Sequence, residues 1–169
     1  MMRSEEDLLE NSDVMQVRLH ATIEQWSKLA DELKRWGQRI SLTAAMHDKV
    51  RLVAEEWFFN IVHHGCEQEG RTAGEELYVD VTATVADERQ GEWQTLQLLF
   101  LDNGKPFDPL QHEAPNMHIP VATKPYGGLG IYLIRQLCSS CYYERKGTCN
   151  QLLMQLTNLD IQHMKDWSE

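Results

Sequence analysis

Two segments of alternating hydrophobicity, which follow each other directly, constrain the fold most. Apolar residues recur at every second position over 77–85 and again over 96–100, and a polar stretch, 87–91, separates the two segments. This alternation is typical of a strand with one buried face. Because no helix stands between the segments, we expect them to pair as a hairpin in a sheet that is not built from alternating strands and helices.

The other segments are interpreted in the same way, with period-two alternation predicting strands and apolar residues three and four apart predicting helices. The further predicted strands are 15–21, 142–145 and 152–156. The predicted helices are 23–40, one that begins near Thr43, and 129–138. Strands in adjacent pairs predict an α/β (α+β) two-layer sandwich, with a mixed, mostly antiparallel sheet and the helices on one face.

Length and charge limit the classes of protein to consider. The 169 residues suit one domain, which we place at 14–158 between an acidic tail, 1–13, and a C-terminal tail, 159–169. A formal charge of -10 repels phosphate backbones and anionic lipid, so nucleic acid and membranes are not expected partners. The chain shows neither a secretory signal nor an apolar run of bilayer length, which predicts a cytoplasmic protein.

The four cysteines are too few for a disulfide scaffold. Cys138 and Cys141 form a C-x-x-C pair, but a structural zinc site would need two more ligands, and Cys66 and Cys149 stand alone. We expect reduced thiols that are buried or half-buried.

Three polar residues interrupt the otherwise apolar middle of the second helix. Glu56, Asn60 and His64 stand four residues apart and therefore share one helix face. They either line a pocket or are ordinary, with Asn60 and His64 hydrogen-bonded in the core and Glu56 reaching solvent. The helix alone does not decide between these alternatives.

Two glycine-rich segments favour the pocket. An apolar strand runs into Asp102-Asn-Gly104, where a carboxylate can accept a hydrogen bond from an exocyclic amine and glycine admits a flat ring, although the same residues also suit a tight turn. Further on, Gly127, Gly128 and Gly130 lead straight into a helix, whose N-terminal amides can bind phosphate, although a hinge would also use glycines.

The segment between these motifs is long and rich in proline. Residues 105–126 hold all five prolines of the chain, and such a loop is usually functional, so we interpret it as a lid over a nucleotide. Other nucleotide motifs are missing. The sequence contains no P-loop pattern, no third dinucleotide-fold glycine, where Leu133 stands instead, and no protein-kinase catalytic loop.

From about Val14 to Thr157 the chain resembles the GHKL (histidine-kinase-like, Bergerat-type) ATP-binding fold, and within it the anti-sigma-factor serine/threonine kinases. Three motifs in the family's order carry the resemblance. They are Glu56-x-x-x-Asn60-x-x-x-His64-Gly65, Asp102-x-Gly104-x-Pro-Phe-Asp-Pro and Gly127-Gly-Leu-Gly130.

The resemblance implies a role for each motif. Asn60 would coordinate a Mg²⁺ ion that bridges the phosphates of ATP, Glu56 would be the general base, and Asp102 would accept the adenine amine. Lys124 would add positive charge from the lid, and the polar contact near the last strand would come from Thr148 or Asn150. The other implied nucleotide-binding residues are His64, Gly104, Gly127, Gly128, Leu129 and Gly130.

The implied function is that of a kinase. It would use ATP to phosphorylate a serine or threonine of an anti-anti-sigma (STAS-like) partner, and would otherwise sequester a sigma factor, as a homodimer. Two alternatives stay open. One is a nucleotide-gated binding module without phosphotransfer, and the other is a detached histidine-kinase catalytic domain, which an N-terminal strand and helix fit poorly.

Overall fold

The structure is a computed structural model that describes residues 14–65, 76–89, 92–111 and 129–157. Five strands form one sheet in the order β1-β2-β3-β5-β4, and all four pairings between neighbours are antiparallel. The predicted hairpin is confirmed as β2 paired with β3. The sheet contains no parallel pair among the described strands, so the mixed character that we allowed for is not seen. The strands are β1 Val14–His20, β2 Tyr78–Arg89, β3 Glu92–Asp102, β4 Ser140–Lys146 and β5 Cys149–Thr157.

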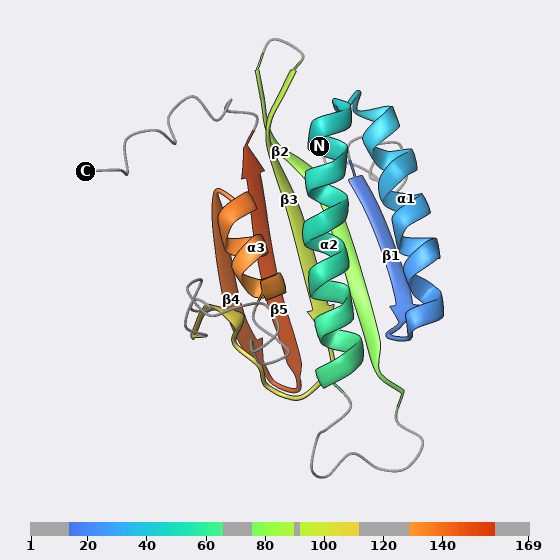
Figure 1. The fold of residues 1–169 in the computed structure, drawn as a ribbon, viewed down its shortest axis with the longest axis vertical. Helices are drawn as coiled ribbons and strands as arrows, with labels where there is room; N and C mark the ends of the chain where they lie inside the picture. The colour runs from blue at the N-terminus through green and yellow to red at the C-terminus, as the bar shows by residue number, and fades with distance from the viewer. Residues whose placement is uncertain (1–13, 66–75, 90–91, 112–128, 158–169) are drawn as a thin grey trace, which may run out of the picture.

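Three helices cover one face of the sheet, which confirms the two-layer sandwich (Figure 1). α1 (Trp26–Arg39) follows a single 3-10 turn, and α3 (Leu129–Leu137) precedes β4. α2 (Ala44–His64) begins where the sequence predicted, because the Thr43 hydroxyl oxygen accepts a hydrogen bond from the Met46 amide at 3.3 Å. α2 crosses the middle of the sheet, with α1 and α3 on either side of it (Figure 1).

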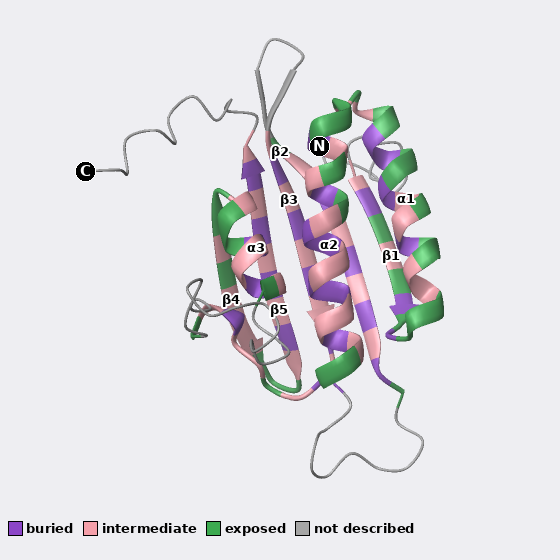
Figure 2. Cartoon of the chain, viewed as in Figure 1, coloured by how far each residue is buried: buried purple, intermediate pink, exposed green. Residues whose placement is uncertain are grey.

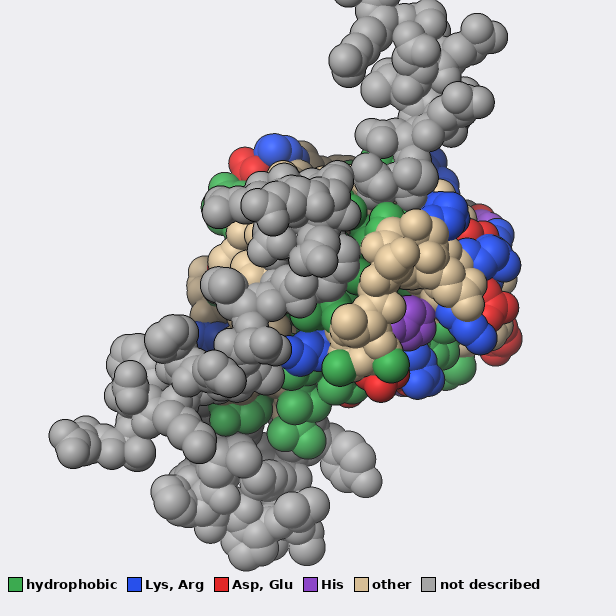
Figure 3. All heavy atoms as spheres, turned by 90° about the horizontal axis from the view of Figure 1, so that it is seen from above, with side chains coloured by type: hydrophobic (Ala, Val, Ile, Leu, Met, Phe, Trp, Pro, Cys, Tyr) green, Lys and Arg blue, Asp and Glu red, His purple; other side chains and the backbone are tan. Residues whose placement is uncertain are grey.

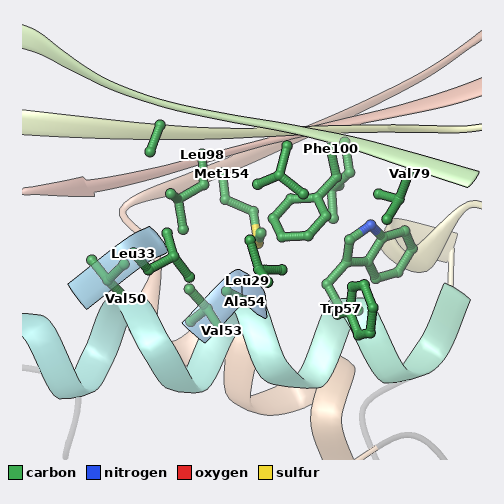
Figure 4. Close-up of a cluster of buried hydrophobic side chains, with 14 of the residues drawn as sticks. Leu29, Leu33, Val50, Val53, Ala54, Trp57, Val79, Leu98, Phe100 and Met154 are labelled. Carbon is green, nitrogen blue, oxygen red and sulfur yellow. The ribbon is translucent and has the colours of Figure 1, made fainter. Parts of the chain in front are cut away.

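The core lies between the helices and the sheet. Buried and less buried residues alternate along the strands, as the sequence pattern predicts (Figure 2). Trp57 and Val53 of α2 face Phe100, Leu98 and Met154 of the sheet (Figure 4). This packing fixes which face of α2 is turned to the sheet, and so fixes the direction of its polar stripe.

The β2–β3 hairpin is longer than predicted. The expected turn began at Asp87, but the ladder continues to Arg89 paired with Glu92. The register shifts between Val85 and Asp87 and again between Asp87 and Glu88. Because the residues of this part of the ladder are polar and pair irregularly, the alternation of apolar residues in the sequence could not reveal it.

At the end of the molecule where α1 ends and α2 begins, acidic, basic and histidine side chains are intermingled (Figure 3). Among the described residues, no helix combines the length and the apolar character needed to cross a membrane.

Candidate functional site

A pocket lies where the C-terminal end of α2 meets the end of β3. Residues from α2, from the segment after β3 and from β5 line it. The structure thus brings Asn60 and His64 of the polar stripe together with the Asp102 motif, which is far away in the sequence. The lining residues are Trp57, Asn60, Ile61, His64, Gly65, Asp102, Lys105, Phe107 and Asn150.

Asn60 and His64 line the pocket from α2, whereas Glu56, with Gly130 against it, lies one turn back on the same helix face and is not part of the lining. We call these four residues the helix side of the pocket, and their position depends on the four-residue spacing along α2. The Asn60 side-chain amide nitrogen donates to the Glu56 carbonyl oxygen at 2.7 Å, one turn back along the helix. The half-exposed Asn60 therefore directs its side-chain oxygen away from its own helix. The His64 ring is stacked on Phe107, with 6.3 Å between the ring centroids and 24° between the planes.

Glu56 links α2 to the first turn of α3. A Cβ atom on Gly130 would collide with the Glu56 carboxylate and lie 3.2 Å from its Cδ, so only a glycine admits this approach without displacing the carboxylate. Partial burial raises the pKa of Glu56, and the charge of Glu55 raises it further. A carboxylate with a raised pKa beside a pocket is suited to accept a proton.

The strand side of the pocket, by which we mean Asp102, Gly104, Tyr143, Arg145 and Asn150, is a hydrogen-bonded network. Asp102 is 2% exposed, and its Oδ1 accepts hydrogen bonds from the Gly104 amide and from the Asn150 side-chain nitrogen, both at 2.8 Å. Asp102 and Asn150 are direct partners in the β3–β5 register, so the sheet itself brings them together.

Asn150 is the centre of this network. Its nitrogen also donates to the Lys105 carbonyl at 2.9 Å, and its oxygen accepts from the Tyr143 hydroxyl and from Arg145 Nη1, each at 2.8 Å. Arg145 Nη1 also donates to the Gly104 carbonyl at 2.8 Å. Burial raises the pKa of Tyr143, which keeps its hydroxyl protonated as a donor.

Sequence reasoning missed Tyr143 and Arg145. They occupy alternate positions on β4, on the same side as Cys141, which packs against the core. A tyrosine and an arginine on the buried side of a strand are a signal that a buried polar partner must exist. Their partner became evident only with the β4–β5 register, in which Arg145 is opposite Asn150.

Five of the predicted residues that the structure describes do not line the pocket: Glu56, Gly104, Leu129, Gly130 and Thr148. Thr148 is exposed, because it follows Gly147 (φ 58°) in the tight turn between β4 and β5. Of the two residues considered for the polar contact near the last strand, Asn150 lines the pocket and Thr148 does not. Leu129 is 54% exposed at the start of α3.

The lid is described only in part. Residues 105–111 are seen, and they contain a 3-10 turn, Pro109–Gln111, where the sequence predicted no regular structure. Lys124, Gly127 and Gly128 lie outside the described residues. Their predicted contacts with phosphate stay predictions.

The donors in the pocket fit a magnesium ion that is held mainly by a nucleotide. Within the described residues, no group of three or more His, Cys, Asp and Glu could form a metal cage. Asn60 offers one neutral hard oxygen beside the pocket, since its nitrogen is used by the Glu56 carbonyl. Mg²⁺ commonly takes one or two protein oxygens and completes its shell with phosphates and water.

Comparison with known proteins gives a family match and a fold match. The model of a histidine kinase-like ATPase domain matches residues 19–156, whereas no curated protein matches. The structure is similar to the RsbU and RsbW domains of Rv1364c from Mycobacterium tuberculosis, with a TM-score of 0.56 and 14% identity over 85% of this chain and 32% of that chain. A histidine kinase domain from the Erythrobacter litoralis EL346 blue-light activated histidine kinase gives a TM-score of 0.44 and 16% identity over 76% of this chain and 60% of that chain. The chain thus spans less than two thirds of either solved structure.

Proposed function

The chain belongs to the histidine kinase-like ATPase family, and on that basis we propose that it binds ATP with Mg²⁺ and transfers the γ-phosphoryl group to a serine or threonine of a protein. The partner that we propose is a small anti-anti-sigma (STAS-like) protein. In the same proposal, the chain sequesters a sigma factor when that partner is phosphorylated.

One observation supports phosphotransfer above all others. The Glu56 carboxylate lies one helical turn from Asn60 and directly against Gly130 at the start of α3. The groups that we propose as proton acceptor and metal ligand are thus close together on α2, next to the start of α3. Phosphoryl transfer depends mainly on such positioning and on charge stabilisation.

The two sides of the pocket would then have different roles. When bound, Mg²⁺ would neutralise charge on the phosphates, and Asn60 would hold it. Glu56 would orient the incoming hydroxyl and accept its proton, for which a raised pKa is favourable. Asp102, fixed by Gly104 and Asn150, would accept the exocyclic amine of adenine.

The partner-switching role depends on the resemblance of three motifs to those of anti-sigma-factor kinases. The solved structure of Rv1364c includes, by its title, an RsbW domain, and its similarity to this chain concerns the fold.

The test is a phosphotransfer assay with purified chain, radiolabelled Mg-ATP and the candidate STAS-like partner. We expect Glu56→Gln to reduce phosphoprotein formation at least 100-fold while ATP affinity changes little, because a lost general base affects the chemical step. The matched control is Glu32→Gln, a carboxylate of α1 that pairs with Arg35 and takes no part in the pKa shift of Glu56, so this variant should keep the activity. Nucleotide-dependent partner binding without any phosphoprotein would instead support the binding module and overturn the kinase.

A further inference from the structure

Trp57 lines the pocket from α2, although the motif that contains it does not specify a residue at this position. It stands three residues before Asn60 and seven before His64, so the three side chains share one face of the helix. Trp57 is 2% exposed, and Phe107 is stacked on it with 6.1 Å between the ring centroids and 25° between the planes. The indole is therefore held between the core and the segment that follows β3.

The indole nitrogen of Trp57 is a buried donor that makes no hydrogen bond. Among the residues that the structure describes, two buried side-chain nitrogens have no hydrogen-bond partner, His47 Nε2 and Trp57 Nε1. Of these two residues, only Trp57 lines the pocket. Buried polar groups in proteins are nearly always hydrogen-bonded, so an unpaired donor at a pocket indicates a place where a ligand or an ordered water binds.

This nitrogen faces the part of the sheet from which Asp102 extends. In Figure 4 it is on the side of the indole that is turned to the sheet, next to Val79. Val79 and Asp102 are direct partners in the β2–β3 register, and Trp57 and Asp102 line the same pocket. A buried N–H donor from α2 and a buried carboxylate from the end of β3 are thus brought to the same part of the pocket.

Asn150, the other buried polar residue of the lining, does not supply such a donor. Its side-chain nitrogen uses both of its hydrogens, one toward Asp102 Oδ1 at 2.8 Å and one toward the Lys105 carbonyl at 2.9 Å. Of the buried side-chain donors that line the described part of the pocket, the indole N–H of Trp57 is therefore the one left for a ligand.

The contacts that hold Trp57 are connected to those that hold Asp102. The Phe107 amide donates to the Tyr143 hydroxyl oxygen at 3.3 Å, and this hydroxyl donates to Asn150 Oδ1 at 2.8 Å. Asn150 in turn donates to Asp102. The ring stacked on Trp57 and the carboxylate thus belong to one connected set of contacts, which fixes donor and acceptor before a ligand arrives.

On the basis of the function proposed above, we propose that Trp57 recognises the adenine base as a hydrogen-bond donor that works beside Asp102. In that function Asp102 accepts the exocyclic amine, so the two side chains present an acceptor and a donor. Adenine is complementary to this pair, because its amine donates and the ring nitrogens on either side of the amine, N1 and N7, accept. The indole N–H donates to one of these nitrogens, directly or through one ordered water.

The test compares, by calorimetry on the whole chain, the affinity for Mg-ATP with that for 1-deaza-ATP and 7-deaza-ATP, in which C–H replaces N1 or N7. We expect one of the two analogues to bind the unmodified chain about 10-fold more weakly than ATP, the size of one lost hydrogen bond. Trp57→Phe, which lacks the N–H group, should also bind ATP about 10-fold more weakly, and should lose nothing further with that analogue. Such non-additive losses are expected only where the indole and the ring nitrogen interact.

Trp36→Phe is the matched control, because Trp36 is a fully buried tryptophan of α1 that does not line the pocket. This variant should keep both the ATP affinity and the penalty of the analogue, and circular dichroism would verify that both variants fold.

The unmodified chain decides the question even if Trp57→Phe does not fold, because two analogues that bind as tightly as ATP overturn the inference. An analogue penalty of unchanged size in Trp57→Phe overturns it as well, while the proposed function stands. A chain that binds no Mg-ATP would instead overturn the proposed function and, with it, the role of Trp57.

Discussion

The two sides of the pocket are built in different ways. On the strand side, every polar side chain is tied to another by hydrogen bonds, and Asp102 and Asn150 are 2% and 3% exposed. On the helix side, Asn60 bonds back to its own helix, His64 is stacked on Phe107, and Glu56 is held against a glycine. The half-exposed polar atoms of the helix side therefore remain close to solvent.

The strand side is thus preorganised, whereas the polar groups of the helix side remain available to a ligand. A buried and fully connected network keeps one geometry, which suits recognition of a flat, invariant group such as a nucleobase. Partly exposed oxygens on a single helix can adjust to phosphates, a metal ion and an incoming hydroxyl. Substitutions on the strand side should therefore affect stability and base binding together, whereas those on the helix side should affect chemistry with little change in stability.

The largest effect on ATP binding should come from Asp102→Asn on the strand side. The amide can keep its oxygen toward Gly104 and Asn150 but loses the carboxylate that would accept the adenine amine. We expect Mg-ATP affinity, measured by calorimetry, to fall about 100-fold, the size of one hydrogen bond to a charged group.

A matched control for that variant is Asp80→Asn. Asp80 accepts two hydrogen bonds from Arg18 at 2.6 Å on the face of the sheet away from the helices, so ATP affinity should not change. Equal affinities in Asp102→Asn and the unmodified chain would mean that Asp102 only maintains the fold.

The next prediction compares the stability of two variants, in each of which an asparagine on one side of the pocket is replaced. Asn150→Ala removes the centre of a buried network and leaves several partners unpaired, so the free energy of unfolding should fall by about 2–3 kcal/mol. Asn60→Ala loses one hydrogen bond within its own helix and should cost less than about 1 kcal/mol. Denaturant unfolding of both variants checks this, and equal losses would remove the contrast between the two sides.

Much of the fold could be predicted because the period of the apolar residues differs so clearly between helices and strands. The alternation over 77–85 and 96–100 identified β2 and β3, and the three-and-four spacing identified α1. The ends of the β2–β3 hairpin were missed because polar residues pair there irregularly. The position of β5 between β3 and β4 is a property of the sheet that local pattern cannot specify.

The candidate site was predictable on the helix side and less so on the strand side. Four-residue spacing along one helix is visible in the sequence, so Glu56, Asn60 and His64 could be placed on one face. The contacts of Asp102 depend on strand register, which decides that Asn150, and not Thr148, lies opposite it. Both residues stand close to Gly147 in the sequence, so the sequence alone could not decide which of them lies opposite Asp102.

Two glycines sharpen the comparison further. A Cβ on Gly104 would lie 2.7 Å from Asp102 Oδ1 and 3.0 Å from the Gly65 Cα, where backbone cannot yield easily. We expect Gly104→Ala to lower the free energy of unfolding by about 1–3 kcal/mol. Gly130→Ala meets mainly the flexible end of Glu56, and the better helix propensity of alanine offsets about 1 kcal/mol of that strain.

The two glycine variants should therefore separate stability from chemistry. Gly130→Ala should unfold at nearly the same denaturant concentration as the unmodified chain, yet form phosphoprotein more slowly, because the carboxylate of Glu56 is displaced. A Gly130→Ala variant with full transfer activity would show that the contact between α3 and Glu56 does not matter for the reaction.

The smallest expected effect is the pH-dependent change in stability that Glu56→Gln causes. The pKa of Glu56 is raised in the folded chain, so the folded state binds this proton more tightly than the unfolded state does, and stability falls as the pH rises through the carboxyl range. Glutamine cannot ionise, so the variant should be more stable at neutral pH, by less than about 0.5 kcal/mol because solvent screens the partly exposed group. The two proteins should converge below the ordinary pKa of a glutamate. Thermal unfolding at both pH values measures this difference, and a variant less stable at neutral pH would mean that the ionised carboxylate of Glu56 stabilises the fold.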